Sequence, residues 1–421
     1  MRHESGAIQV ASCTADVERE KMRGFSFVHA ADLHLGYSQY GLEVRRQDFD
    51  TAFRELVDKT IELKPDFMII AGDLFHQARP SNVTLENAIR NFGRLREAGI
   101  PVLTVDGSHD SAPNNITGTI LNPLDSAGLI YHLPRHEGAC WQKPGCCYVY
   151  GVPNYRTRHK TEEMLPEFLA RNKPEPDRSV FSIFVLHMAL DLPNIKPPYM
   201  EAEAPPELIP EGFDYYAAGH VHKPYVSKFK TGTLVYSGCT ETTDYFEAKA
   251  EKGFYHVKVD EKKNITTHFV NFETVRKFVV LEQDFTGMSP SKITEHSVQL
   301  VKGSDDDGVV IVPVIKGTLP AEASRTEVDV SKIRSAAEKA LLVHPVIQLR
   351  ESEVSDEVVR SIFESKFTDL RTKAFEYFLK IFSERYNVAE AERTARAAVS
   401  LVESLVKKEE DKVRQTIEEL L

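Results

Sequence analysis

Five short apolar segments, each followed directly by side chains that can bind metal ions, constrain the fold of this 421-residue chain more than any other feature. The segments end at Ala31, Gly72, Gly107, Leu186 and Gly219. The polar residues that follow are, in chain order, Asp32 with His34, Asp73, Ser108 with His109 and Asp110, His187, and His220 with His222. Apolar runs of this length are typical of buried β-strands that are covered on both faces. Because α/β sheets bind ligands beyond the carboxyl ends of their strands, we expect these side chains to converge.

The chemistry of these side chains predicts a metal site. Aspartate and histidine in this combination suit Mn²⁺, Fe²⁺ or Zn²⁺. One carboxylate shared between two ions is a usual way to hold a metal pair about 3.5–4 Å apart. Each histidine alone has another interpretation, as a hydrogen-bonded core residue. Five ligand sets in succession, each at the end of an apolar segment, favour the metal interpretation.

The order of these motifs resembles the signature of the calcineurin-like metallophosphoesterases. The matching residues are Asp32-Leu33-His34, Gly72-Asp73, Gly107-Ser108-His109-Asp110, His187 and Gly219-His220-Val221-His222. The amino-acid sequence around these motifs is similar to that of the SbcD and meiotic-recombination-eleven nucleases of DNA double-strand break repair. The similar segments run from Ala31 to Gly36, from Gly72 to His76 and from Gly219 to Pro224. The resemblance covers roughly residues 24–275. It implies an α/β fold, a two-sheet α/β/β/α metallophosphoesterase sandwich.

The resemblance also implies roles for the motif residues around two divalent ions, with Mn²⁺ as the expected metal. One ion would be held by Asp32, His34, Asp73 and His222, and the other by Asp73, Ser108, His187 and His220, with Asp73 bridging. His109 would stabilise the developing charge or protonate the leaving oxygen, and His76 would position the scissile phosphate. At Ser108 the family expects asparagine. A serine hydroxyl is shorter and a poorer donor, so the second ion should be bound more weakly.

Charge and composition limit which partners and which cellular compartment fit this protein. The formal net charge of −11 argues against a protein that coats DNA nonspecifically, although it allows a local basic track. Candidate phosphate contacts are Arg156, Arg158, Lys160 and Lys223, with a solvated loop as the alternative. No run approaches the ~20 apolar residues of a membrane span, and the first twenty residues lack an apolar signal core. Five cysteines without zinc-type spacing fit a reducing compartment, so we expect a cytoplasmic protein.

Changes in pattern along the chain predict four segments: a disordered extension over 1–22, the nuclease domain over 23–275, a small α+β capping domain over 276–350 and a helical partner-binding segment over 351–421. By resemblance, the capping domain orients DNA. Apolar spacing predicts helices over about 44–61, 81–98, 114–127, 162–170 and 330–342. By resemblance, the family dimerises through helices in the region of the expected 81–98 and 114–127 helices, so Leu85, Ile89 and Leu124 could face a second copy, with core packing as the alternative.

The C-terminal segment is rich in aromatic side chains at helical spacing. Its candidate partner-binding residues are Phe363, Phe367, Leu370, Phe378 and Phe382. Such a surface either packs on its own domain or binds a partner. By resemblance, the partner would be the coiled-coil base of an SbcC-type ATPase, the radiation-sensitive-fifty relative.

The motifs and the resemblance together predict a manganese-preferring DNA nuclease that works as a homodimer with an ATPase. The resemblance implies single-strand endonuclease and 3′-to-5′ exonuclease activity. Two alternatives remain open. One is a small-molecule phosphodiesterase of the same superfamily, and the other is a scaffold subunit whose cleavage is impaired by Ser108.

Overall fold

A computed structural model describes residues 22–112, 118–176, 178–193, 195–197, 200–321, 323–351, 367–383 and 388–406. Residues 1–21 of the expected N-terminal extension, and the candidate partner-binding residue Phe363, lie outside these ranges. The chain divides into two compact units. The first comprises the chain up to Val280 together with Gly308–Val310, and the second comprises Leu281–Asp307 and the chain from Ile311 onward.

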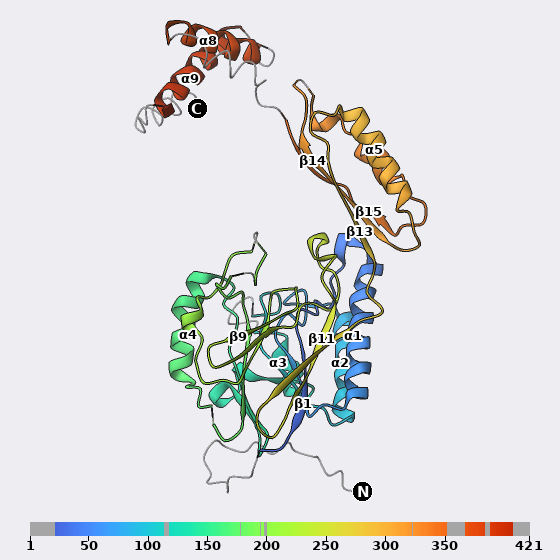
Figure 1. The fold of residues 1–421 in the computed structure, drawn as a ribbon, viewed down its shortest axis with the longest axis vertical. Coiled ribbons are helices and arrows are strands. Elements are labelled where there is room, and N and C mark those ends of the chain that lie inside the picture. The colour runs from blue at the N-terminus through green and yellow to red at the C-terminus, as the bar shows by residue number, and fades with distance from the viewer. Residues whose placement is uncertain are drawn as a thin grey trace. The chain divides into compact units, whose positions relative to one another are not determined.

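The described part of the first unit contains two six-stranded sheets (Figure 1). The first sheet has the order β12-β11-β1-β2-β3-β4. Its strands are β1 (Phe25–Ala30), β2 (Phe67–Ile70), β3 (Val102–Thr104), β4 (Tyr131–His132), β11 (Gly253–Val259) and β12 (Ile265–Asn271). Strands β1 to β4 are parallel, whereas β11 and β12 continue the sheet in antiparallel fashion from β1.

The second sheet has the order β5-β6-β7-β8-β10-β9. Its strands are β5 (Cys140–Lys143), β6 (Cys147–Gly151), β7 (Phe181–His187), β8 (Tyr215–Gly219), β9 (Tyr225–Phe229) and β10 (Gly232–Tyr236). Its inner strands β6, β7, β8 and β10 are parallel, and β5 and β9 pair with them in antiparallel fashion. The parallel strands explain the uninterrupted apolar runs in the sequence, because such strands are buried on both faces.

The two sheets share a core in which aromatic rings interlock. The ring of Phe27 on β1 stacks on that of Phe67 at 5.2 Å and meets that of Tyr215, from the other sheet, edge-on at 5.2 Å. Successive side chains of a strand point to opposite faces. Accordingly Val28 and Ala30 contribute to a different core cluster, beneath the helices. Each strand of the first sheet therefore ties the central core to an outer layer.

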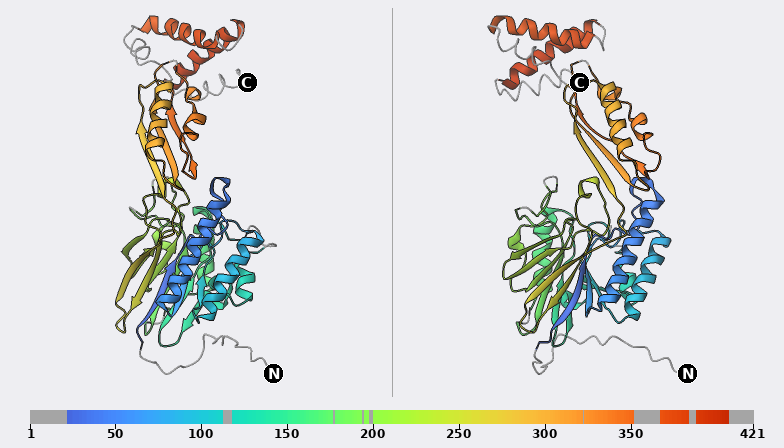
Figure 2. Two further views of the ribbon diagram at one scale, coloured as in Figure 1. Left: turned by 90° about the vertical axis from the view of Figure 1, so that its right-hand side faces the viewer. Right: turned by 45° about the vertical axis from the view of Figure 1, so that its right-hand side comes forward.

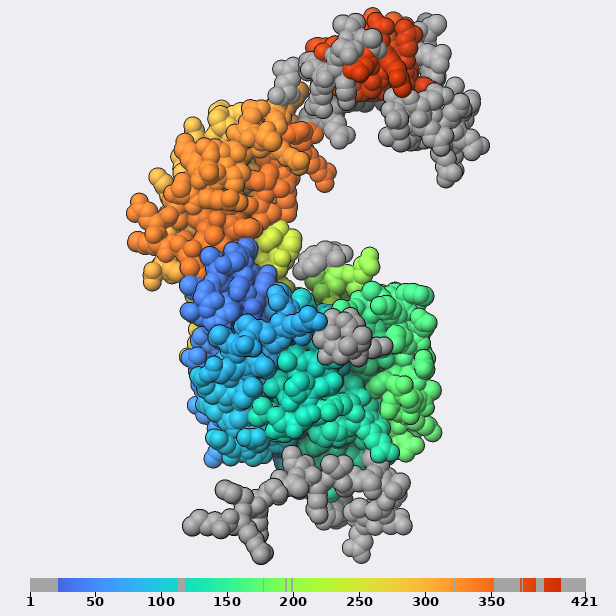
Figure 3. Space-filling view, turned by 180° about the vertical axis from the view of Figure 1, so that it is seen from behind, coloured from blue at the N-terminus to red at the C-terminus, as the bar shows by residue number. Residues whose placement is uncertain are grey.

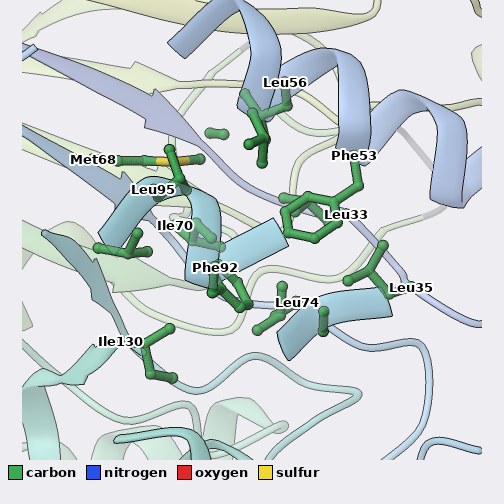
Figure 4. Packing of buried hydrophobic residues seen from close by; sticks show 14 of the residues in the cluster. Leu33, Leu35, Phe53, Leu56, Met68, Ile70, Leu74, Phe92, Leu95 and Ile130 are labelled. Carbon is green, nitrogen blue, oxygen red and sulfur yellow. The ribbon is translucent and has the colours of Figure 1, made fainter. Parts of the chain in front are cut away.

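Helices cover the outer faces of both sheets, with α1 and α2 on the first and α4 on the second (Figure 2). The helices of this unit are α1 (Glu43–Leu63), α2 (Asn82–Glu97), α3 (Leu121–Ser126) and α4 (Arg158–Arg171). The rings of Phe53 and Phe92 meet at 5.3 Å between α1 and α2, among the buried side chains of Figure 4. Helix α2 begins where predicted, because the Ser81 side chain accepts from the backbone N–H of Thr84 at 3.2 Å.

Two expected helices differ in extent from the sequence-based interpretation. The helix expected over 114–127 is the six-residue α3, and residues 113–117 lie outside the described ranges. Helix α4 is longer than the expected 162–170 because the Thr157 side chain caps it by accepting from the Lys160 N–H. In the space-filling view, α1 and α2 (blue) adjoin the segment after residue 118 (teal) on one face of this unit (Figure 3).

The second unit contains a small sheet with α5 on one face (Figure 1). Its elements are β13 (Phe278–Asp284), α5 (Pro290–Gly303), β14 (Val310–Thr318), α6 (Val330–Arg334), β15 (Leu342–Val343) and β16 (Val346–Arg350), where the first residues of β13 and β14 still belong to the first unit. The expected helix over 330–342 is wrong in extent. The Asp305 carboxylate accepts from the backbone N–H groups of Glu338, Lys339 and Ala340, which holds the chain in a turn after α6.

The helices α8 (Phe367–Ser383) and α9 (Val388–Val406) pack on each other. Ala391 and Ala395 of α9 are fully buried, and the Arg396 guanidinium lies 5.1 Å from the centre of the Phe375 ring. Small residues on one helix allow the aromatic side chains of the other to approach closely. Two sheets between helical layers, an α+β unit and C-terminal helices confirm the predicted fold class.

Candidate metal centre

Sharp turns at the strand ends turn the predicted ligands toward one another. Asp32, His34, Asp73 and His220 all have positive φ, at 55°, 45°, 47° and 84°. This left-handed region is uncommon for residues other than glycine, and strained residues of this kind cluster at functional sites. Strands β1, β2 and β8 end within four residues of these positions. The same turns that end the strands therefore aim the side chains.

The ligands form two adjoining groups, Asp32 with His34 and His222, and Asp73 with His187 and His220. Within each group the potential ligand atoms lie within 4.8 Å of one another. In the first group, the Nε2 atoms of His34 and His222 are 3.3 Å apart, and Oδ1 of Asp32 is 3.7 Å from Nε2 of His222. All six residues come from predicted positions, and the structure brings them together as the sequence suggested.

Asp73 stands between the two groups. Its Oδ2 atom lies 3.1 Å from Nε2 of His187 and 4.0 Å from Nε2 of His34. The backbone N–H of His109 donates to its Oδ1 at 2.8 Å, and the Ser108 hydroxyl donates to Oδ2 at 3.2 Å. The side chain contacts residues of both groups, which is the position that a bridging carboxylate requires.

Two of the histidines have their outer ring nitrogen occupied by an acceptor. Nδ1 of His187 donates to the Ala71 carbonyl at 2.7 Å, and Nδ1 of His222 lies 2.6 Å from the Glu247 carboxylate. The other nitrogen of each ring therefore faces the site. Nε2 of His187 is fully buried and lies 3.1 Å from Oδ2 of Asp73, but without the alignment of a regular hydrogen bond. A buried nitrogen without a hydrogen bond is costly, and a metal ion would satisfy it.

Glycines and a buried aspartate allow the loops to approach this closely. A side chain at Gly72, which has φ of 86°, would place its Cβ 2.3 Å from Nδ1 of His187. A Cβ at Gly107 would lie 2.1 Å from the backbone nitrogen of Asp73. Asp110 ties the same loops together, because its carboxylate accepts from the backbone N–H groups of Gly107 and Leu74, each at 2.7 Å. Only glycine fits at the two close approaches.

Burial and charge shift the acid–base equilibria of the site in opposite directions. Burial raises the pKa of Asp32 to about 6, whereas burial lowers the pKa of His220 to about 3 and that of His34 well below its usual value. His34 and His220 are therefore neutral near pH 7, the state in which imidazole binds metals. Burial opposes protonation of His187, but the Asp73 and Asp32 carboxylates outweigh it and raise its pKa to about 10. A cation at this position would displace that proton.

The two predicted catalytic histidines lie beside the ligands. The rings of His76 and His109 stack at 4.8 Å, and Tyr37 stacks on the other side of His76 at 3.8 Å. His109 is exposed, and its Nδ1 donates to the His76 carbonyl at 2.9 Å. Burial, and then the nearby His109, lower the pKa of His76 to about 4. The stack holds both imidazoles next to His34, whose ring centre lies 4.8 Å from that of His109.

The donor set fits a pair of divalent ions. Two facing Nε2 atoms, the buried Nε2 of His187 and the carboxylates of Asp32 and Asp73 converge in one place, and among the described residues these carboxylates pair only with histidines. A cation between them would neutralise the carboxylates and use the free lone pairs of the imidazoles.

The four candidate phosphate contacts differ in their surroundings. Arg156 donates to the Ser111 hydroxyl and carbonyl at 2.8 and 3.1 Å, so it holds the loop after Asp110. Arg158 pairs with Glu162 and Asp191 at 2.9 and 3.1 Å. Lys160 and Lys223 are exposed.

The candidate dimer and partner-binding residues differ in how exposed they are. Leu124 is 2% exposed and belongs to the core beneath the helices, Leu85 packs against that core, and Ile89 is 44% exposed. Phe378 and Phe382 are half-buried, with ring centres 6.1 Å apart. Phe367 and Leu370 lie on α8, but the structure does not describe their side chains.

Sequence reasoning assigned no role to Asp110, Tyr37 or Glu247. Asp110 is part of the quoted Gly107-Ser108-His109-Asp110 motif, so its position was visible although its loop-tying role was not. Tyr37 and Glu247 carry no motif. Glu247 follows His222 by 25 residues and reaches it only through the fold.

The fold and the site together define a class of protein, the phosphoesterases with a dinuclear divalent metal centre. The family model described as calcineurin-like phosphoesterase matches residues 25–224. That range contains all the predicted ligands.

Curated relatives narrow the assignment. The chain is 30% identical over 375 residues to the DNA double-strand break repair protein Mre11 of Archaeoglobus fulgidus, covering 83% of this chain and 80% of that protein. It is 28% identical over 336 residues to that of Methanopyrus kandleri, covering 77% and 70%. It is 33% identical over 244 residues to that of Methanocaldococcus jannaschii, covering 55% and 62%. The chain belongs to the Mre11 family of calcineurin-like phosphoesterases. It is a metal-dependent phosphodiesterase.

Within the part of the chain that the structure describes, no helix combines the length and apolar character needed to cross a membrane.

Proposed function

We propose that this protein is a DNA nuclease of double-strand break repair that uses two Mn²⁺ ions and acts in the cytoplasm. The proposal rests on one observation: the carboxylate of Asp73 contacts residues of both ligand groups. The relatives named as DNA double-strand break repair proteins support DNA as the substrate. The family resemblance adds single-strand endonuclease and 3′-to-5′ exonuclease activity to the proposal.

In this proposal Asp32, His34, Asp73 and His222 would hold one ion, and Asp73, Ser108, His187 and His220 the other. When bound, such ions neutralise the non-bridging phosphate oxygens and make a water molecule nucleophilic near neutral pH. The backbone N–H groups of His109 and His220 orient the two carboxylates, because they donate to Asp73 and Asp32 at 2.8 and 3.0 Å. Preorganised carboxylates need little rearrangement during the reaction.

His109 is the proposed proton donor to the leaving oxygen. Its Nδ1 proton is committed to the His76 carbonyl, so a protonated His109 can release a proton to substrate only from Nε2. His76 is the proposed phosphate-positioning residue. Its ring lies between those of Tyr37 and His109, which restricts its rotation.

Nuclease assays with the purified protein test this proposal. Labelled single-stranded and double-stranded DNA would be incubated with Mn²⁺ or Mg²⁺, beside a generic phosphodiester such as bis-p-nitrophenyl phosphate. We expect Mn²⁺-dependent cleavage of DNA, with shortening from the 3′ end. Rapid hydrolysis of the small diester without cleavage of either DNA would instead support a small-molecule phosphodiesterase.

We further propose a homodimer that binds an ATPase of the SbcC or Rad50 type. Ile89 is the exposed member of the candidate dimer residues, and helix α8 carries the half-buried aromatic side chains Phe378 and Phe382. Light scattering of the protein and of Ile89→Asp tests the dimer. A dimeric Ile89→Asp would place the contact elsewhere on the surface.

A further inference from the structure

The short helix η5 (Tyr245–Glu247) places a carboxylate behind one metal ligand. Oε1 of Glu247 lies 2.6 Å from Nδ1 of His222, and the Thr243 hydroxyl lies 2.9 Å from the same nitrogen. The opposite ring nitrogen, Nε2, faces His34 and Asp32 at 3.3 and 3.7 Å. The imidazole of His222 thus spans from Glu247 on one side to the metal site on the other.

The second oxygen of Glu247 is already engaged, which leaves Oε1 for His222. Oε2 accepts from the Thr243 hydroxyl at 2.8 Å and from its backbone N–H at 3.3 Å, and the Cys239 thiol lies 3.6 Å away. The side chain of Glu247 is only 15% exposed. A carboxylate held by this many partners has little freedom to turn away from the ring.

His222, Cys239 and Glu247 are also close enough to be considered as a metal site of their own. The position of Lys252 argues against that interpretation. Its buried ammonium lies 3.2 Å from Sγ of Cys239 and 3.7 Å from Oε2 of Glu247. A positive charge already compensates these side chains, so a second cation among them would be repelled.

The acceptors beside Nδ1 of His187 and Nδ1 of His222 differ in charge, and at a third histidine, His220, Nε2 lies 3.4 Å from Oε2 of Glu203. Nδ1 of His187 donates to a neutral carbonyl, that of Ala71, whereas Nδ1 of His222 faces the Glu247 carboxylate. A carboxylate behind a histidine fixes which ring nitrogen carries the proton and makes the other a stronger ligand. The ion held by His222 should therefore depend on Glu247, because no other ligand in either group contacts that carboxylate among the described residues.

We propose that Glu247 is a positioning residue that keeps the proton of His222 on Nδ1 and so strengthens Nε2 as the ligand of one metal site, without acting on the other. The inference rests on the proposed dinuclear function of the centre. It concerns metal binding, however, and does not depend on whether the substrate is DNA.

Metal titration of Glu247→Gln tests the inference. Glutamine keeps the shape and can still accept a hydrogen bond, but it removes the charge. Calorimetric titration with Mn²⁺ should show one of the two sites weakened by about 10- to 100-fold, with the other changed by less than about threefold. The matched control is Glu251→Gln, which removes the same charge from an exposed neighbour and should leave both affinities unchanged. Cleavage by Glu247→Gln should need more Mn²⁺ but approach the parental rate at saturation.

Equal weakening of both sites, or no change in either, would overturn the proposal. Nitrogen-15 NMR of the Zn²⁺-loaded parental protein provides a test that needs no variant. The imidazole of His222 should carry its proton on Nδ1, and a proton on Nε2 instead would also refute the assignment. A parental protein that binds two ions but leaves DNA intact would contradict the proposed nuclease function and leave the role of Glu247 standing.

Discussion

The hydroxyl of Ser108 lies 3.2 Å from Oδ2 of Asp73 and donates a hydrogen bond to it. The same oxygen of Asp73 lies 3.1 Å from Nε2 of His187. Ser108 therefore interacts with the carboxylate at the centre of the site, at the position where the resembling family has an asparagine. The longer amide of asparagine would extend past this point toward the second ligand group.

We predict that Ser108→Asn tightens the second metal site. An amide oxygen is a better metal ligand than a neutral hydroxyl and reaches roughly one bond further. The Mn²⁺ concentration for half-maximal cleavage should fall by at least about tenfold, equivalent to ~1.4 kcal/mol, with a smaller change at saturating metal. Calorimetric titration of both proteins gives the two affinities directly. Two tight sites of similar affinity in the Ser108 protein, unchanged by the substitution, would show that serine already serves as a full ligand.

Ser108→Ala is the matched control for this prediction. If the hydroxyl only bonds to Asp73, its removal should change either metal affinity by no more than about fivefold, because a typical hydrogen bond contributes about 1 kcal/mol. A tenfold loss at one site in Ser108→Ala would instead indicate direct ligation by serine.

Replacement of Asp73 by alanine should abolish hydrolysis of every substrate. Its carboxylate contacts both ligand groups, so both ions lose a ligand at once. We expect less than about a tenth of the parental rate, a barrier increase of at least ~1.4 kcal/mol. Circular dichroism should confirm that the variant is folded. A folded variant that retains more activity than this would refute the bridging role.

The convergence of the candidate ligands could be predicted from the sequence because each belongs to a local signal. Asp32, Asp73 and His187 end or directly follow buried strands, and parallel strands deliver their carboxyl ends to one edge. The apolar runs identified the strands, and the order of the motifs identified the class. The convergence of the six candidate ligands could then be predicted without any interatomic distance.

Interactions between distant segments could not be predicted in this way. Glu247 contacts His222 from the short helix η5, which carries no sequence motif, and Arg156 binds Ser111, a residue 45 positions earlier in the chain. The 330–342 helix was overestimated because side-chain capture of a backbone turn, here by Asp305, leaves no periodic signal. Local propensity yields to such tertiary hydrogen bonds.

The aromatic pair on α8 provides a prediction about partner binding. Phe378 and Phe382 are half-buried and stack at 6.1 Å, so a charge placed there would disrupt an apolar surface. Phe378→Glu should weaken binding of an SbcC-type ATPase by at least about 30-fold, or ~2 kcal/mol, as expected for an aromatic anchor. Affinity pull-down measures this, with Ser383→Glu on an exposed position of α8 as the control. Helix content must be compared as well, because undiminished binding by a folded Phe378→Glu would assign these rings to the protein's own packing.

A buried histidine in the central core should make the stability of the protein depend on pH. His29 is fully buried on β1, with Nδ1 2.9 Å from the Tyr215 hydroxyl, and burial lowers the pKa of His29 to about 3. The unfolded chain binds this proton near the usual pKa of about 6.5. Between these pH values the unfolded state binds more protons than the folded state. The contribution of neutral His29 to the stability of the folded state is therefore full above about pH 6.5 and is lost as the pH falls toward 3. At pH 5 the loss should be about 2 kcal/mol relative to pH 8. Urea unfolding in EDTA should show that His29→Gln reduces the pH dependence by this amount, whereas His268→Gln, at an exposed position of the same sheet, should not. An unchanged pH dependence in His29→Gln would mean that His29 is not the group responsible.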